Sequence, residues 1–127
     1  MADEVIKEIE PSEVIIRPLG LKAILTVPLQ ASGIVIFAHG SGSGRLSPSN
    51  NYVASALQDA GFATLLLDLL TPEEGWDRAN VFDISLLASR LSMAARWVRE
   101  QPDLQDMPIG YFGASTGAGA ALVAAAR

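Results

Sequence analysis

Residues 113–117 read Gly-Ala-Ser-Thr-Gly and match the pattern G-x-S-x-G. Chance produces such a match in a chain of this composition in roughly a few per cent of cases. The context is more specific, because the motif follows the apolar segment 107–112 and opens a run of mostly small residues, 114–126. A sharp strand-to-helix turn with small flanking residues presents a serine at a helix N-terminus, where negative charge is stabilised. Ser115 is therefore the candidate nucleophile, and the N–H of Thr116 is a candidate oxyanion donor.

A second candidate feature is the glycine-rich loop that begins at residue 39 and reads His39-Gly40-Ser41-Gly42. A turn after an earlier strand can hold a backbone N–H toward an oxyanion. The N–H of Ser41 or Gly42 is the second candidate donor, with Gly40 beside them. The loop fails as a dinucleotide-binding motif, because position 45 is arginine where G-x-G-x-x-G needs glycine.

Each candidate residue also has a structural interpretation. Ser115 could serve only as a helix N-cap. His39, the single histidine, could anchor its loop or act as a base in an unusual position. Asp68, which ends an apolar segment, could be a substitute acid, or it could cap a turn or pair with Arg45. Arg45 could bind an acidic substrate group or face water.

The elements that position these residues follow from the hydrophobic pattern. Continuous apolar runs predict strands covered on both faces, and a stripe at helical spacing predicts amphipathic helices. Gly61 is the expected stop of the first helix. The expected strands are 4–10 with 13–17, then 21–27, 33–38, 62–67 and 107–112. One helix is expected to begin at Ser47-Pro48, and two more are expected over 80–100 and 114–126. An irregular link is expected at 69–79. This alternation predicts an α/β fold, a three-layer αβα sandwich with a mostly parallel sheet of about five strands.

Composition narrows the class of protein. The length of 127 residues predicts a single domain, 1–127, and 50% hydrophobic with 18% charged residues excludes a disordered chain. A net charge of −5 argues against nucleic acid as a partner. There is no cysteine, no metal-ligand spacing and no cofactor motif, so we expect neither metal nor cofactor. The apolar runs are too short to cross a membrane and the acidic start is unlike a signal peptide, which predicts a cytoplasmic protein.

Three segments together resemble the N-terminal half of a dienelactone-hydrolase-like α/β-hydrolase: 34–45, 64–74 and 113–126. The resemblance covers nearly the whole chain but only about half of the family's domain. It implies half of an α/β-hydrolase fold, with a serine nucleophile at Ser115, oxyanion donors at Gly40–Ser41 and Thr116, and action on small esters or lactones. His39 matches the family's oxyanion-loop histidine, which is not the general base.

The family's catalytic acid and base follow later strands, and these residues are absent from the 127 present. We therefore expect weak or no turnover unless another chain supplies a base. The alternative is a non-catalytic half-domain, whether truncated, remnant or designed, that dimerises or binds a small ligand. In either case the apolar segment 107–112 and the helix after it predict a homodimer, unless the N-terminal strands shield that edge.

Overall fold

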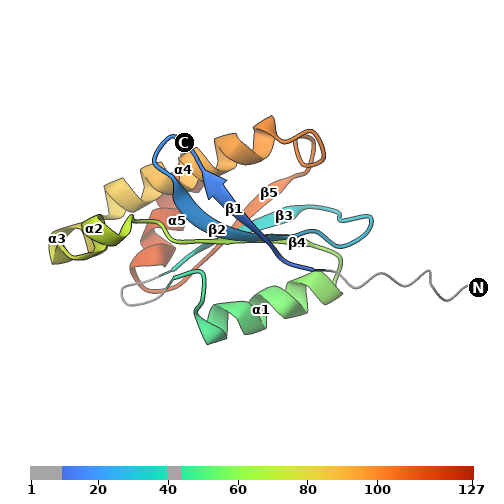
Figure 1. Ribbon diagram of the computed structural model, residues 1–127, viewed down its shortest axis with the longest axis horizontal. Coiled ribbons are helices and arrows are strands. Elements are labelled where there is room, and N and C mark those ends of the chain that lie inside the picture. The colour runs from blue at the N-terminus through green and yellow to red at the C-terminus, as the bar shows by residue number, and fades with distance from the viewer. Residues whose placement is uncertain (1–9, 40–43) are drawn as a thin grey trace, which may run out of the picture.

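The computed structural model describes residues 10–39 and 44–127 of the chain. Its centre is a five-stranded sheet in the order β1-β2-β4-β3-β5 (Figure 1). The strands are β1 (Ser12–Ile16), β2 (Leu21–Thr26), β3 (Ile34–Ala38), β4 (Ala63–Leu67) and β5 (Ile109–Gly113). All five strands occur where the hydrophobic pattern predicts them; residues 4–9 of the first expected segment lie outside the described residues.

The sheet is mixed, with a parallel centre. β3 pairs in parallel with β4 on one side and with β5 on the other. β2 is antiparallel to both of its neighbours, β1 and β4. Only β2 therefore runs against the other four strands, which confirms a mostly, but not wholly, parallel sheet.

Helices cover both faces of the sheet and complete the expected three layers. Helix α1 (Pro48–Asp59) lies on one face, while α4 (Ile84–Glu100) and α5 (Thr116–Ala126) lie on the other (Figure 1). The smaller core, under α1, contains Phe37, Ala54 and Leu66. The larger core unites the other sheet face with the apolar stripes of α4 and α5. Both helix layers cover β3 and β4, which explains why these strands are apolar on both faces.

The first helix has the ends that the sequence predicts. The Ser47 side chain accepts a hydrogen bond from Asn50 N–H, and Pro48 occupies the first turn, where its missing N–H costs nothing. Gly61, just after the helix, has a φ of +94°, which glycine adopts without strain.

The expected irregular link at 69–79 instead contains two short helices. These are α2 (Pro72–Gly75) and α3 (Arg78–Val81), and α4 begins only at Ile84 rather than at 80. The cause is capping: Asp77 and Asp83 each accept a backbone N–H at a helix start, and Thr71 forms a capping box with Glu74. Three separate N-caps divide the segment into three helices.

Strand β5 forms one edge of the sheet, and β1 forms the opposite edge. The described N-terminal strands, β1 and β2, therefore do not shield β5, while residues 4–9 of the first expected segment lie outside the described residues. Helix α5 buries Gly117, Ala120, Ala121 and Ala124, but Leu122 on its outer side is 74% exposed. Within residues 10–39 and 44–127, no helix combines the length and apolar character needed to cross a bilayer.

Candidate active site

Ser115 lies at a sharp turn between β5 and α5. Its backbone has φ +57° and ψ −132°, a combination that side-chain-bearing residues rarely adopt. The side chain makes no capping hydrogen bond, and the residue is exposed. Ser115 thus occupies the N-cap position of the eleven-residue helix α5, but its side chain does not cap the helix.

The glycines on either side of Ser115 are required by close packing. A Cβ on Gly113 would lie 2.5 Å from the carbonyl oxygen of Gly117. A Cβ on Gly117 would overlap the carbonyl groups of Ala38 and His39. A side chain at 113 would therefore separate β5 from the start of α5, and one at 117 would separate α5 from the end of β3.

The turn that carries Ser115 is hydrogen-bonded to the end of β3. In the parallel register Gly113 lies opposite Ala38, and Ala114 N–H donates to the carbonyl of Ala38 at 3.3 Å. Ser115 and His39 therefore leave neighbouring strand ends, as the sequence predicts. The expected donors Gly40 and Ser41, together with Gly42, lie outside the described residues.

Thr116 is the first residue of α5. At this position its main-chain N–H has no acceptor within the helix, so it can donate to an anionic oxygen beside Ser115. The hydroxyl Oγ1 of Thr116 is buried without a hydrogen-bond partner among the described residues. Such a group costs free energy unless something completes it.

His39 is held through one ring nitrogen. Leu69 N–H donates a hydrogen bond to His39 Nε2 at 3.2 Å. A neutral imidazole has one acceptor nitrogen, so its proton is then on Nδ1 and its lone pair is already used. This geometry favours the anchoring interpretation of His39 over the base interpretation.

Asp68 pairs with Arg45, as one interpretation of the sequence predicts. The carboxylate accepts from Arg45 N–H at 2.7 Å and from Arg45 Nη1 at 2.6 Å. Gly44 passes so close that a Cβ there would lie 2.6 Å from Asp68 Oδ1. A carboxylate with both oxygens engaged is poorly suited to act as the substitute acid.

A cleft of about 510 Å³ opens at the carboxyl ends of β3 and β4, where parallel sheets bind ligands. His39, Arg45 and Asp68 form part of its wall, and Leu70, Thr71 and Leu87 form another part. A volume of this size is typical of a small-molecule site. Within the described residues no group of acidic and histidine side chains is arranged to bind a metal ion.

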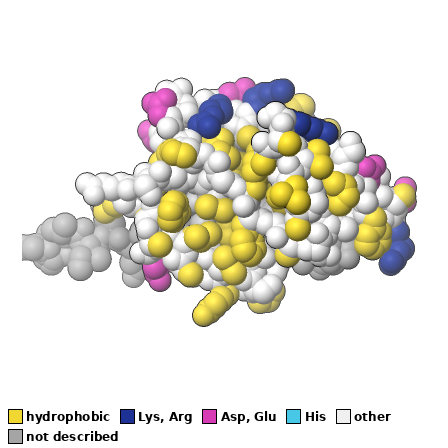
Figure 2. All heavy atoms as spheres, turned by 180° about the vertical axis from the view of Figure 1, so that it is seen from behind, with side chains coloured by type: hydrophobic (Ala, Val, Ile, Leu, Met, Phe, Trp, Pro, Cys, Tyr) yellow, Lys and Arg dark blue, Asp and Glu magenta, His cyan; other side chains and the backbone are white. Residues whose placement is uncertain are grey.

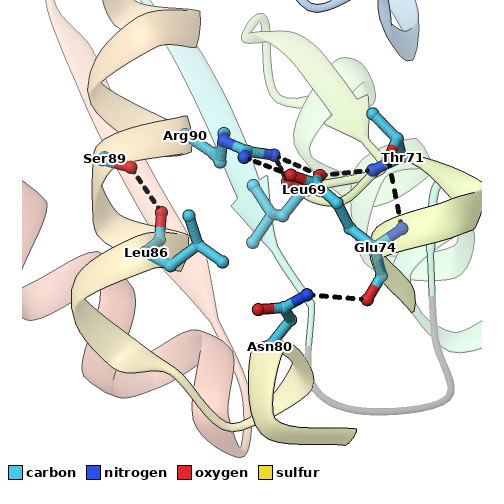
Figure 3. A network of polar contacts seen from close by, with 7 residues as sticks. All are labelled: Leu69, Thr71, Glu74, Asn80, Leu86, Ser89 and Arg90. Carbon is cyan, nitrogen blue, oxygen red and sulfur yellow. Dashed lines mark hydrogen bonds and ion pairs between the residues drawn. The ribbon is translucent and has the colours of Figure 1, made fainter. Parts of the chain in front are cut away.

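One polar pair close to this cleft, Arg90 and Glu74, was not predicted from the sequence. Arg90 of α4 is only 6% exposed and binds Glu74 (Figure 3). Its guanidinium hydrogen bonds lower the pKa of Glu74 from 4.5 to about 2. The capping-box spacing from Thr71 to Glu74 was the available signal for the helix, but nothing in the sequence indicated the partner.

The fold and this turn define a class: a partial α/β-hydrolase-like fold with its strand-to-helix serine turn. A dienelactone hydrolase of Anabaena variabilis is 56% identical to this chain, with a TM-score of 0.84. The match covers 91% of this chain and 57% of that one. The resemblance to dienelactone-hydrolase-like α/β-hydrolases is thereby confirmed. An esterase of Pyrococcus furiosus, with a TM-score of 0.71 and 20% identity over 91% of this chain and 45% of its own, shares the fold.

Curated relatives occur in two strains of Mycobacterium tuberculosis, each with a provisional name as a phosphoribosyl transferase. They are 62% identical over 117 residues, which is 92% of this chain but 26% of theirs. This chain thus spans about a quarter of the curated relatives it matches. No protein-family model matches the chain.

Proposed function

We propose that this chain carries the nucleophile-bearing part of a serine hydrolase for small esters or lactones. The observation that carries the proposal is Ser115, an exposed serine at φ +57° on the N-terminus of α5. The likeness to a dienelactone hydrolase at 56% identity supports the same reaction class.

In the proposed reaction, Ser115 Oγ attacks the carbonyl carbon of the substrate. The negative oxygen that forms would accept the N–H of Thr116 at the helix N-terminus. Collapse breaks the bond to the alkoxide, which takes up the serine proton, and water later releases the acid from the acyl-serine. Among the 127 residues, His39 is the single histidine. Because its Nε2 already accepts from Leu69, we expect the proton-transferring base to come from outside these residues.

The phosphoribosyl transferase name of the curated relatives does not favour a second activity here. The match leaves about three quarters of those proteins uncovered. The chain instead shares its fold with hydrolases and esterases.

A fluorophosphonate probe followed by intact mass measurement tests the proposal, because it reports serine nucleophilicity without requiring turnover. We expect slow, single-site labelling that Ser115→Ala abolishes. Ser85→Ala, an exposed serine on α4, is the matched control and should label like the unchanged chain. Labelling spread over several serines, or unaffected by Ser115→Ala, would contradict the proposal and favour a non-catalytic module.

We further propose that a second copy covers the β5 edge. Within the described residues no strand pairs with the outer side of β5. A groove of about 500 Å³ beside it is lined by apolar and small residues, among them Ile109, Gly110, Tyr111 and Leu122. Seen from behind, the molecule has many hydrophobic side chains across the middle of that face, with charged side chains toward its margins (Figure 2). Antiparallel pairing of two β5 strands would satisfy both sets of unpaired backbone groups in a closed dimer.

A further inference from the structure

The described residues on either side of positions 40–43 are held by two consecutive residues after β4. Asp68 binds Arg45 through both its main-chain N–H and its guanidinium. The next residue, Leu69, donates its N–H to His39 Nε2. Both ends of the segment 39–45 are therefore set by the path of the chain at Asp68 and Leu69.

Leu69 is itself fixed by α4. Its carbonyl accepts a hydrogen bond from Arg90 Nη1 at 3.1 Å, and its side chain is fully buried. The two peptide groups that flank the Leu69 Cα are thus bound on opposite sides, one by His39 and one by Arg90. A displacement of Arg90 would be transmitted to His39 through this single residue.

Arg90 is oriented in turn by Glu74. Two hydrogen bonds of 2.7 Å join its guanidinium to the two carboxylate oxygens (Figure 3). The same carboxylate accepts Thr71 N–H at 2.9 Å, and the Glu74 carbonyl accepts Asn80 Nδ2 at 3.1 Å. This bidentate geometry leaves the guanidinium one orientation, the one in which Nη1 also reaches Leu69.

The position of this pair favours a role beyond stability. Burying an ion pair is a weak way to stabilise a fold, since apolar residues of similar size do as well or better. The pair instead fixes the geometry of its neighbours, because Arg90 also binds the Leu69 carbonyl and Glu74 also binds the Thr71 N–H. Leu69 leads to His39, and Thr71 lines the cleft.

We propose that Arg90 and Glu74 are positioning residues that, through Leu69, hold His39 in one tautomer at the end of β3, next to the strand end that leads to Ser115. This proposal rests on the proposed hydrolase function for its purpose. Its physical core, the link from Arg90 to the His39 ring, can be measured independently.

Nuclear magnetic resonance of the isotope-labelled imidazole tests the link, because His39 is the single histidine and its signals are unambiguous. In the unchanged chain we expect one tautomer, with the proton on Nδ1, and slow exchange of the Leu69 amide. Arg90→Gln and Glu74→Gln should mix the tautomers and speed Leu69 exchange about tenfold, the effect of losing one hydrogen bond to a charged group. Arg90→Lys keeps the charge and one donor, so its tautomer mixture and its Leu69 exchange rate should lie between those of the unchanged chain and Arg90→Gln.

The matched controls are Arg96→Gln on the same helix and Glu73→Gln beside Glu74, both exposed. They should leave the His39 signals and Leu69 exchange unchanged. An unchanged tautomer in a folded Arg90→Gln or Glu74→Gln chain would overturn the proposal. If Arg90→Gln does not fold, Arg90→Lys and Glu74→Gln carry the test, and native-like His39 signals in both would overturn it.

The fluorophosphonate labelling rate of Ser115 separates the two proposals. Slower labelling in Glu74→Gln together with a mixed tautomer supports positioning for chemistry. If the unchanged chain is not labelled at all, the hydrolase function is contradicted. If the His39 tautomer still depends on Arg90 in that case, the link from Arg90 to His39 is nevertheless supported.

Discussion

Leu69 N–H donates a hydrogen bond of 3.2 Å to Nε2 of His39, across 30 positions of the sequence. This contact joins the carboxyl ends of β3 and β4 and occupies the acceptor nitrogen of the only imidazole in the chain. His39 therefore has a structural role in the wall of the cleft. Among the described residues, Ser115 is left without a histidine that could act as its base.

Turnover by the 127-residue chain is expected to be weak, because Nε2 of its single histidine already accepts a hydrogen bond from Leu69 instead of taking the Ser115 proton. Hydrolysis of an activated aryl ester, compared between the unchanged chain and Ser115→Ala, measures this. Because His39 is not expected to act as the base, His39→Ala should lower the residual rate far less than Ser115→Ala does. Robust turnover that Ser115→Ala abolishes would refute the expectation, and an equally large loss in His39→Ala would favour a base role for that residue.

Replacing Ser115 tests the strain in its backbone. At φ +57° and ψ −132°, glycine avoids a Cβ conflict that serine and alanine both have. Ser115→Gly should therefore be more stable than Ser115→Ala by about 1–2 kcal/mol, measured by urea denaturation. Equal stabilities of the two variants would show that this turn is unstrained.

Gly117→Ala should destabilise the chain by about 2 kcal/mol, because the added methyl group would overlap the Ala38 carbonyl and force β3 and α5 apart. Gly75→Ala, at the end of α2, is the matched control, since a Cβ there meets no atom within 4 Å. It should leave the free energy of unfolding unchanged or slightly higher. Similar losses in both variants would argue against steric contact as the cause.

Acid should weaken the fold through Glu74. Its pKa falls from 4.5 to about 2 on folding, chiefly because Arg90 donates hydrogen bonds to its carboxylate. A depressed pKa contributes stability that is fully present above 4.5 and is lost as the pH falls toward 2. The urea midpoint of Glu74→Gln should accordingly change less over this pH range than that of the unchanged chain or of Glu73→Gln.

The chain should form dimers at micromolar concentration, and Leu122→Glu should convert them to monomers, because it places a charge on the exposed face of α5 beside the β5 groove. Light scattering gives the mass directly. Leu29→Glu, at a leucine that is 78% exposed in the turn between β2 and β3, is the control and should remain dimeric. A clean monomer of the unchanged chain would contradict the proposed dimer.

The sequence by itself determined the strands, the three main helices and the turn at Ser115. These follow from local causes: continuous apolar runs, a serine and a proline at the start of α1, and glycines at 113 and 117 where no Cβ fits. The resemblance to dienelactone-hydrolase-like proteins followed from the same segments. Local patterns were less informative at 69–83, where three separate caps produced helices that hydrophobic spacing did not predict.

Only the tertiary structure decided which groups meet at the cleft. The partnership of Arg90 with Glu74 and Leu69, and the tie from Leu69 to His39, join residues that are 16 to 30 positions apart. Charged residues on a helix look alike in sequence whether they face water or a partly buried carboxylate, because periodicity records apolar faces alone. The strand order likewise placed β5 at one edge and β1 at the other. That order depends on how strands far apart in the chain pair, and the hydrophobic pattern of each strand taken singly does not contain it.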